Sequence, residues 1–175
     1  MKKLSISELK RVDIQEYKEL PKHPVVVVLD NVRSLHNIGS VFRTCDSFLI
    51  HSVYLCGITA QPPHRGIQKT ALGATETVNW IYFKNTSDAV ASLKDSDYTI
   101  IAVEQMNDAI PLQNFVPQKD QKIALIFGHE VKGISDDIVG ELDTALEIDQ
   151  FGTKHSLNIS VCAGIVLWHI TSSLK

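Results

Sequence analysis

The chain has 175 residues, of which 44% are hydrophobic and 21% charged, and its formal net charge at pH 7 is −3. This balance is typical of one compact globular domain and leaves little room for a second one. The charge lacks the positive excess that is usual in nucleic-acid binders, so any RNA contact would require a local basic patch.

The N-terminal residues 1–24 are expected to form a short helical segment of a single domain that spans residues 1–175. Charged residues follow the first lysines, where a signal peptide would have an apolar core. The most apolar stretch, residues 157–170, is shorter than the roughly 20 residues that cross a bilayer. We therefore expect a cytoplasmic protein with no membrane contact. The basic residues of the segment fit either a solvated helix face or an RNA contact; they are Lys2, Lys3, Lys10, Arg11, Lys18 and Lys22.

The cysteines and histidines do not indicate a metal site. The three cysteines form no CxxC pair and fall in apolar patterns, which favours reduced thiols packed as small hydrophobic groups. The seven histidines lack the spacing of zinc ligands, so no metal is expected.

Strands and helices are predicted to alternate along the chain. Residues 25–29 are β-branched without alternation, as in a strand buried on both faces of a parallel sheet. Residues 38–49 have the apolar spacing of a helix. Further strands are predicted at residues 53–56, 78–83, 98–103, 123–127 and 145–148, and helices after a cap at Thr86 or Ser87, after Ser135, and at residues 157–172.

These elements predict an α/β fold, a mostly parallel sheet with helices on both faces, in which ligands bind at the carboxyl ends of the strands. The last helix is apolar nearly all round. One face would cover its own sheet and another would pack on a second copy, so a homodimer is expected; the alternative is burial within the monomer.

Three strand-terminal loops are rich in glycine and small polar residues, whereas the GxxxxGK[ST] and GxGxxG patterns of nucleotide sites are absent. In the first loop, Asn37 lies at a helix start and Gly39 permits close approach of the backbone. Arg43 is expected to lean toward the helix N-terminus, within reach of Asn37 and of a phosphate in the strand-end cleft. The alternative is an N-cap asparagine followed by a surface arginine.

The second loop follows a buried strand and brackets Glu130 between Gly128 and Gly133. A tight turn would explain the glycines, and so would close approach to a bound ligand, with Glu130 as hydrogen-bond acceptor. The third loop leads into the last helix through a set of small polar residues that exceeds what one cap needs, so that either some face a ligand or the capping is redundant. They are Ser156, Asn158 and Ser160.

In this order the three loops resemble motifs one, two and three of the SpoU family, also called the TrmH family, of the SPOUT class of methyltransferases. The resemblance extends from about residue 25 to residue 170, and the ordered set is far more specific than any single motif. The matching positions are Asn37, Gly39 and Arg43 in motif one, Phe127, Gly128, Glu130 and Gly133 in motif two, and residues 156–161 in motif three.

The resemblance implies a sheet whose C-terminal segment forms a deep trefoil knot, which composition and periodicity could not have predicted. It also implies a homodimer that binds S-adenosyl-L-methionine and methylates a ribose 2′-hydroxyl in structured RNA, either tRNA or rRNA. The implied cofactor-binding residues are Phe127, Gly128, Glu130, Gly133, Ile148, Ser156, Leu157 and Asn158. The implied catalytic residues are Arg43, Asn37, Glu130, Ser156 and Asn158.

Some features depart from the family's pattern. Asp149 follows Ile148 where many members have proline, and the same loop carries Lys154 and His155. Many relatives carry an extra RNA-binding domain, so RNA recognition here is expected to rest on the catalytic domain, the N-terminal segment and the second subunit.

A guanidinium keeps its proton up to about pH 12. Arg43 is therefore expected to bind phosphate and stabilise a developing alkoxide rather than to act as a base.

Two alternative functions remain. The first is a non-catalytic module of the same fold that binds RNA or cofactor, which the net negative charge would suit. The second is a Rossmann-like enzyme of small-molecule metabolism, since fold alone does not dictate function. The missing dinucleotide fingerprint disfavours the second alternative.

Overall fold

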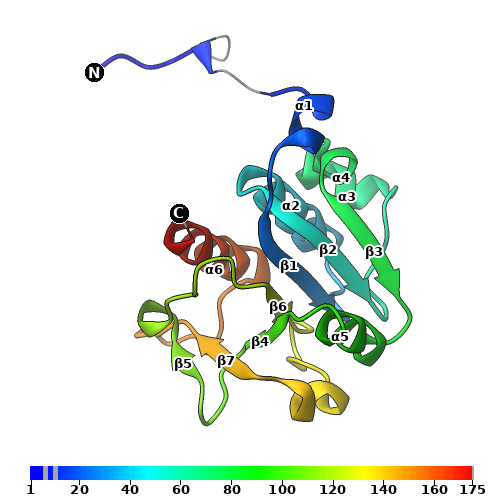
Figure 1. The fold of residues 1–175 in the computed structure, drawn as a ribbon, viewed down its shortest axis with the longest axis vertical. Coiled ribbons are helices and arrows are strands. Elements are labelled where there is room, and N and C mark those ends of the chain that lie inside the picture. Colours follow the sequence, from blue (N-terminus) through cyan, green and yellow to red (C-terminus); the bar gives the residue numbers. More distant parts are fainter. Residues whose placement is uncertain (6–7, 10–11, 175) are drawn as a thin grey trace.

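The structure is a computed structural model that describes residues 1–5, 8–9 and 12–174. Within these residues seven strands pair in parallel into one sheet, in the order β3-β2-β1-β6-β4-β7-β5 (Figure 1). The strands are β1 His23–Asp30, β2 Ile50–Cys56, β3 Asn79–Phe83, β4 Thr99–Val103, β5 Ile110–Pro111, β6 Ile123–Phe127 and β7 Thr144–Glu147.

The centre of the sheet is formed by β1 and β6, which are neighbours although almost a hundred residues of chain separate them. All residues of β6 and the last six of β1 are buried. β-branched and other apolar side chains on both faces of such strands leave no polar side for solvent. The two strands that the sequence marked as fully apolar are thus confirmed as the middle of the sheet.

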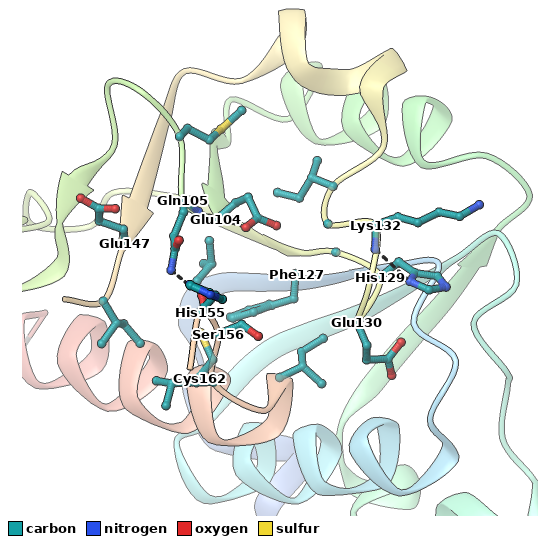
Figure 2. Close-up of a pocket in the computed structure, with 18 of the residues that line it drawn as sticks. Glu104, Gln105, Phe127, His129, Glu130, Lys132, Glu147, His155, Ser156 and Cys162 are labelled. Carbon is teal, nitrogen blue, oxygen red and sulfur yellow. Dashed lines mark hydrogen bonds between the residues drawn. The ribbon is translucent and has the colours of Figure 1, made fainter. Parts of the chain in front are cut away.

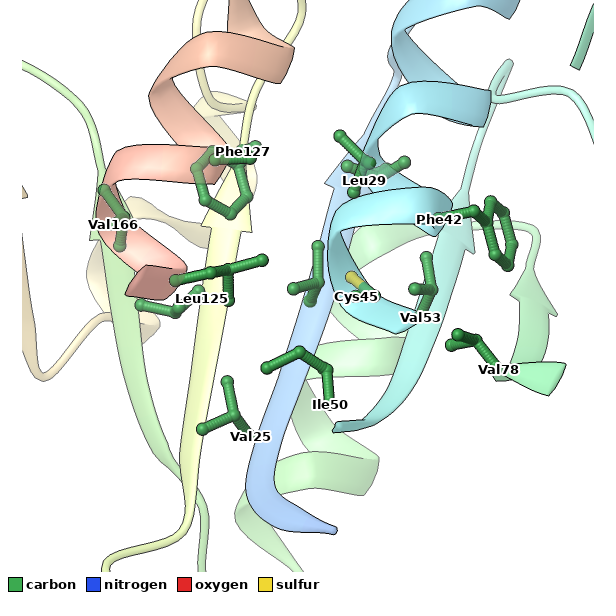
Figure 3. Packing of buried hydrophobic residues seen from close by; sticks show 14 of the residues in the cluster. Val25, Leu29, Phe42, Cys45, Ile50, Val53, Val78, Leu125, Phe127 and Val166 are labelled. Atoms are coloured by element: carbon green, nitrogen blue, oxygen red, sulfur yellow. The ribbon is translucent and has the colours of Figure 1, made fainter. Parts of the chain in front are cut away.

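Helices cover both faces of the sheet, as predicted. On one face α2 (Leu35–Ser47) and α6 (Ile159–Ser173) pack on β1, β2 and β6, together with α3 (Arg65–Ala71) and α4 (Ala74–Thr77) (Figure 3). On the other face lie α5 (Thr86–Lys94) and the 3-10 helix η3 (Asp136–Glu141). Within the described residues, no helix is long and apolar enough to cross a membrane.

The helix α1 spans Ile14–Glu19, which is only part of the helical segment predicted for residues 1–24. Lys10 and Arg11, two of the basic residues considered for RNA contact, lie outside the described residues. The cap predicted for α5 at Thr86 or Ser87 is wrong: Asn85 is the N-cap, and the Thr86 hydroxyl donates to a buried carboxylate.

Several short elements were not predicted at all. They are α3, α4, β5 and the 3-10 helix η2 (Leu112–Asn114). Gly39 of α2 allows α3 to pack closely, since a Cβ at this position would lie 2.2 Å from the carbonyl oxygen of Ile67. The close backbone approach expected at Gly39 is therefore an approach of α3, and tertiary packing stabilises a helix too short to be stable alone.

Candidate functional site

A cavity of about 670 Å³ opens at the carboxyl ends of β4, β6 and β7 (Figure 2). Parallel α/β sheets bind ligands at this edge, and the volume is within the range of roughly 300–1,000 Å³ that is usual for cofactor sites. All eight residues predicted to bind the cofactor line it, namely Phe127, Gly128, Glu130, Gly133, Ile148, Ser156, Leu157 and Asn158. Their location is as predicted, and their binding role stays a prediction.

One wall of the cavity is a tight hairpin formed by residues 128–133. His129 and Gly133 exchange two backbone hydrogen bonds of 2.9 Å. A Cβ at Gly128 would lie 2.2 Å from the carbonyl carbon of Gly133, and Gly133 itself has a positive φ of 70°. Of the two explanations left open for these glycines, the tight turn is therefore sufficient, because backbone packs on backbone here.

The same hairpin orients the His129 ring. Its Nδ1 accepts hydrogen bonds from the backbone N–H groups of Val131 (3.0 Å) and Lys132 (3.3 Å). An Nδ1 that accepts carries no proton, so in the neutral ring the proton is on Nε2. Lys132 lies at the mouth of the cavity and points away from the centre (Figure 2).

Glu130 joins the second loop to the first. One carboxylate oxygen accepts from the backbone N–H of Arg33 (3.1 Å), and the other accepts from the N–H of Ser34 (3.0 Å) and from the side-chain amide of Asn37 (3.3 Å). Three donors on one carboxylate hold the end of β1, the start of α2 and the hairpin in a fixed arrangement.

Asn37 in turn joins the first loop to the third. Its side-chain oxygen accepts from the Nδ2 of Asn158 (3.1 Å), and the Oδ1 of Asn158 caps α6 by accepting from the N–H of Ser160 (2.9 Å). The alternative that Asn37 is an N-cap is wrong, because Ser34 caps α2 by accepting from the N–H of Asn37. The structure therefore connects all three motifs through the chain Glu130–Asn37–Asn158.

The hydrogen bonds keep Glu130 ionised. Burial by itself would raise its pKa, but hydrogen bonds from its own backbone, from Arg33 and Ser34, and from the Asn37 amide outweigh burial and lower the pKa below its ordinary value. A carboxylate with a lowered pKa and its oxygens already occupied is a weak base, so the contacts of Glu130 suit a positioning group better than a proton acceptor.

The two remaining predicted catalytic residues differ in placement. Ser156 lines the cavity and precedes α6, so it is not the cap of that helix, and its hydroxyl has no partner among the described residues. Arg43 is exposed on α2 and does not line the cavity. In the described part of the chain its guanidinium makes no hydrogen bond, so the expected reach of Arg43 to Asn37 is not formed within one chain.

Asp30 was missed by the sequence interpretation. It ends β1, is fully buried, and accepts from the Thr86 hydroxyl (2.5 Å), from the Asn31 amide (2.8 Å), and from both the N–H (2.7 Å) and the hydroxyl (2.9 Å) of Ser135. Asn31, in the left-handed region with φ of 57°, also accepts from the N–H of Ile58. Asp30 thus connects the loop after β1 with Thr86 and Ser135. The sequence feature that could have identified Asp30 is an acidic residue at the end of an otherwise apolar strand.

Asp149 and His155, the residues of the third loop that depart from the family's pattern, contact the segment that follows β4. The amide of Gln113 donates to Asp149 (2.5 Å), and the amide of Gln105 donates to the backbone oxygen of His155 (2.9 Å). Asp149 therefore anchors the third loop to the segment that follows β4. No group of three or more potential metal ligands occurs among residues 1–5, 8–9 and 12–174.

A parallel α/β sheet with a strand-end cavity, bordered by three connected polar loops, is the arrangement in which enzymes of the α/β class commonly bind a cofactor. The model of the SpoU rRNA Methylase family matches residues 24–168. The chain therefore belongs to the SpoU rRNA methylase family and is a methyltransferase, as the ordered motifs predicted.

The names of two similar proteins state which RNA and which ribose hydroxyl they methylate. A tRNA (guanosine(18)-2′-O)-methyltransferase of Borreliella burgdorferi is 26% identical over 170 residues, which are 97% of this chain and 76% of the relative. The 23S rRNA (guanosine-2′-O-)-methyltransferase RlmB of Neisseria meningitidis is 29% identical over 150 residues, 86% of this chain and 59% of the relative. The chain thus spans about three fifths of the length of the second relative.

Solved structures share the fold. The TrmH/SpoU tRNA modifying enzyme of A. aeolicus superposes with a TM-score of 0.80 at 24% identity, covering 91% of this chain and 80% of that one. An AdoMet-bound rRNA methyltransferase of Sinorhizobium meliloti has a TM-score of 0.78 at 21% identity, covering 87% of this chain and 58% of that one. The ligand predicted for this chain is thus the one bound in a protein of the same fold.

Proposed function

We propose that this chain transfers the methyl group of S-adenosylmethionine to a ribose 2′-hydroxyl of a structured RNA, either tRNA or rRNA, and that it does so in the cytoplasm as a homodimer. The observation that carries the proposal is the hydrogen-bonded chain Glu130–Asn37–Asn158, which brings the three motifs together at the edge of the cavity. The names of the two relatives, both 2′-O-methyltransferases, support the ribose hydroxyl as acceptor.

The residues present suit this cofactor. The cavity combines apolar walls from Phe127, Ile148 and Leu157 with backbone groups of the 128–133 hairpin, which match an adenosyl group with few charged contacts. When bound, S-adenosylmethionine supplies a methyl group on a positively charged sulfur. The protein's task is then to place the ribose oxygen in line with that methyl and to assist loss of the hydroxyl proton.

Roles for the polar residues follow from their contacts. Glu130 holds Asn37, and Asn37 holds Asn158, so this amide pair forms a rigid rim at the cavity. Ser156, whose hydroxyl is without a partner among the described residues, is free to hydrogen-bond the ribose. Arg43 binds the phosphate next to the target nucleotide and stabilises negative charge on the attacking oxygen.

Exposed basic side chains near the cavity supply the local patch that RNA binding requires of a chain with net charge −3. Arg33 lies beside Glu130, Lys132 lies at the cavity mouth, and Lys154 lies in the third loop; all three are exposed. Together they would contact phosphates on either side of the target nucleotide.

A homodimer would cover the free face of α6. Val161, Ile165 and Trp168 recur at helical spacing, with exposed fractions of 51%, 38% and 60%. A stripe of large apolar side chains on one helix face is typical of an interface between subunits. Since α2 packs against α6, a partner seated on α6 would lie near the outward residues of α2, which include Arg43. We infer that Arg43 serves the partner's site.

The function is tested by titrating the protein with S-adenosylmethionine in a calorimeter, followed by transfer of labelled methyl groups to total tRNA and rRNA. Nucleoside mass spectrometry should then find 2′-O-methylated ribose. Absence of cofactor binding, or methyl groups found only on bases, would contradict the proposal.

Arg43 is tested in trans by mixing two inactive variants, Arg43→Ala and Glu130→Ala, in one dimer. If Arg43 serves the partner's site, the mixed dimer has one complete site and regains up to about half of the wild-type rate per dimer. If Arg43 acts within its own chain, both sites are defective and no activity returns. Each homodimeric variant serves as the control.

The alternative is a binding module of the same fold that lacks catalysis. The intact contacts of Asn37, Glu130 and Asn158 favour an enzyme. The Arg43→Ala variant separates the two functions, since an enzyme should lose turnover and keep its affinity for the cofactor. A wild-type protein that binds cofactor and RNA but forms no methylated product would instead be a binding module.

A further inference from the structure

Glu104 is a carboxylate of the cavity wall that was not among the predicted site residues. It directly follows β4, and its backbone N–H donates to the carbonyl oxygen of Leu146 (3.1 Å), which ties it to β7. Its side chain is partly buried and lines the cavity. Figure 2 shows the carboxylate directed into the cavity above Phe127.

One oxygen of Glu104 has no partner. Oε1 accepts from the backbone N–H of Gln105 (3.0 Å), whereas Oε2 accepts no hydrogen bond from the described residues. A Cβ at Gly133 would lie 2.7 Å from Oε2, so the glycine leaves room for this oxygen. Oε2 of Glu104 is therefore available to accept a hydrogen bond from a donor group of a ligand in the cavity.

The neighbouring thiol is not a candidate for that donor. Burial, and after it the charge of Glu104, raise the pKa of Cys162 to about 11, so the thiol remains protonated and is only a weak donor. The other carboxylates of the wall differ from Glu104. Glu130 already accepts three hydrogen bonds, and Glu147 lies at the outer edge of the cavity and points away from Phe127 (Figure 2).

The position of Glu104 decides which part of a ligand it meets. Under the proposed function the reactive methyl lies beside Asn37 and Asn158, where the RNA ribose would enter, whereas Glu104 follows β4 on the far side of the hairpin. The apolar residues near Glu104 suit an adenine ring and the carbon side of its ribose; they are Val103, Phe127, Leu146 and Ile148. A ribose carries two hydroxyl donors, and carboxylates at strand ends commonly accept from such hydroxyls.

We propose that Glu104 accepts a hydrogen bond from a ribose hydroxyl of the bound S-adenosyl group, and thereby makes the cavity selective for ligands with an intact ribose diol. This inference rests on the proposed function, because it assumes that the cavity holds S-adenosylmethionine. The competing donors on the same ligand are its α-ammonium group and the 6-amino group of its adenine.

The test compares the dissociation constants of S-adenosylhomocysteine and of its 2′-deoxy, 3′-deoxy and desamino analogues, measured by calorimetry. The wild type should bind one of the deoxy analogues about 10- to 100-fold more weakly than the parent, as expected for loss of a hydrogen bond to a charged group. In Glu104→Ala the parent should weaken by a similar factor, and removing the same hydroxyl should cost nothing more.

Glu147→Ala is the matched control, since it removes a carboxylate from the same cavity and should keep the wild-type ratio. Glu104→Gln keeps the side-chain shape and should give an intermediate ratio, which allows the test if the alanine variant folds poorly. The proposal is overturned if the ratio of the dissociation constants of the deoxy analogue and the parent is the same in Glu104→Ala as in the wild type. It is also overturned if the wild type binds both deoxy analogues as tightly as the parent, or if Glu104→Ala instead abolishes the difference between the desamino analogue and the parent. A wild type that binds neither S-adenosylmethionine nor its product would overturn the proposed function itself.

Discussion

At the scale of single residues, the site depends on carboxylates that act as acceptors for backbone and side-chain donors. Asp30 and Glu130 each accept three or more hydrogen bonds from segments far apart in the chain. Asp30 is fully buried and organises the loops below the site, whereas Glu130 is exposed and organises the motifs at its rim. The two should therefore respond differently to substitution.

Asp30→Ala should lower the free energy of unfolding by about 2–4 kcal/mol, because buried donors of Thr86 and Ser135 lose their acceptor. Urea denaturation measures this change. Asp108→Ala is the control, since Asp108 is exposed and makes no side-chain hydrogen bond among the described residues; it should change stability by less than about 0.5 kcal/mol. Equal effects of the two substitutions would contradict the role given to Asp30.

Glu130→Gln should make folding less sensitive to acid. The pKa of Glu130 is lowered in the folded protein, so its carboxylate stabilises the fold above the pKa of the unfolded chain, and this contribution is lost as pH falls through the folded value. The difference in unfolding free energy between wild type and variant should thus be constant near neutral pH and shrink below about pH 4. Denaturant titrations from pH 7 to pH 3 measure it; a difference independent of pH would refute the assignment.

At the scale of elements, the cavity wall depends on a hairpin in which backbone touches backbone. The His129–Gly133 pair closes residues 128–133 into a turn that follows the buried strand β6. The glycines of motif two are explained by that geometry and need no ligand. The ligand would benefit indirectly, because the turn presents a rigid wall to the cavity.

Gly128→Ala should weaken binding of S-adenosylmethionine at least tenfold and destabilise the fold by about 2 kcal/mol, because the new methyl would overlap the backbone of Gly133 and Ile134. Calorimetric titration and thermal unfolding measure the two effects. Gly140→Ala is the control, since a Cβ there meets nothing within 4 Å. An unchanged affinity in Gly128→Ala would show that the hairpin is not part of the cofactor site.

At the scale of the whole molecule, the proposed homodimer is supported by the exposed apolar face of α6 and by the absence of Arg43 from the cavity lining. The two observations are independent, since one concerns exposed apolar side chains on α6 and the other a predicted catalytic residue, Arg43, that does not line the cavity of its own chain. The trefoil knot implied by the resemblance to the SpoU family stays a prediction at this same scale. Threading of the C-terminal segment through a closed loop would be expected to slow refolding.

Trp168→Glu should convert the dimer into a monomer and abolish methyl transfer, because a charge buried in an apolar interface is strongly unfavourable. Light scattering after size exclusion measures the mass of the particle. Ile81→Glu is the control, since Ile81 is 48% exposed on the edge strand β3, away from α6. A wild type that is monomeric at micromolar concentration, or an active Trp168→Glu monomer, would argue against the dimer.

The sequence by itself determined the class of the fold and the location of the site. Short uninterrupted runs of β-branched and apolar residues such as residues 123–127 are typical of central parallel strands, and polar loops at the carboxyl ends of such strands lie along one edge of the sheet. Short elements such as α3 and β5 could not be predicted, because their stability comes from packing and not from their own residues.

Tertiary structure alone decided which polar residues act together. Asn37 looked like a helix cap, but Ser34 caps α2 and leaves the Asn37 amide to join Glu130 with Asn158, residues 93 and 121 positions away in sequence. Glu104 belonged to no motif and reached the cavity only because β4 lies beside β6 in the sheet. Local sequence patterns report on hydrogen bonds a few residues apart, whereas contacts across a hundred residues depend on how the strands are ordered.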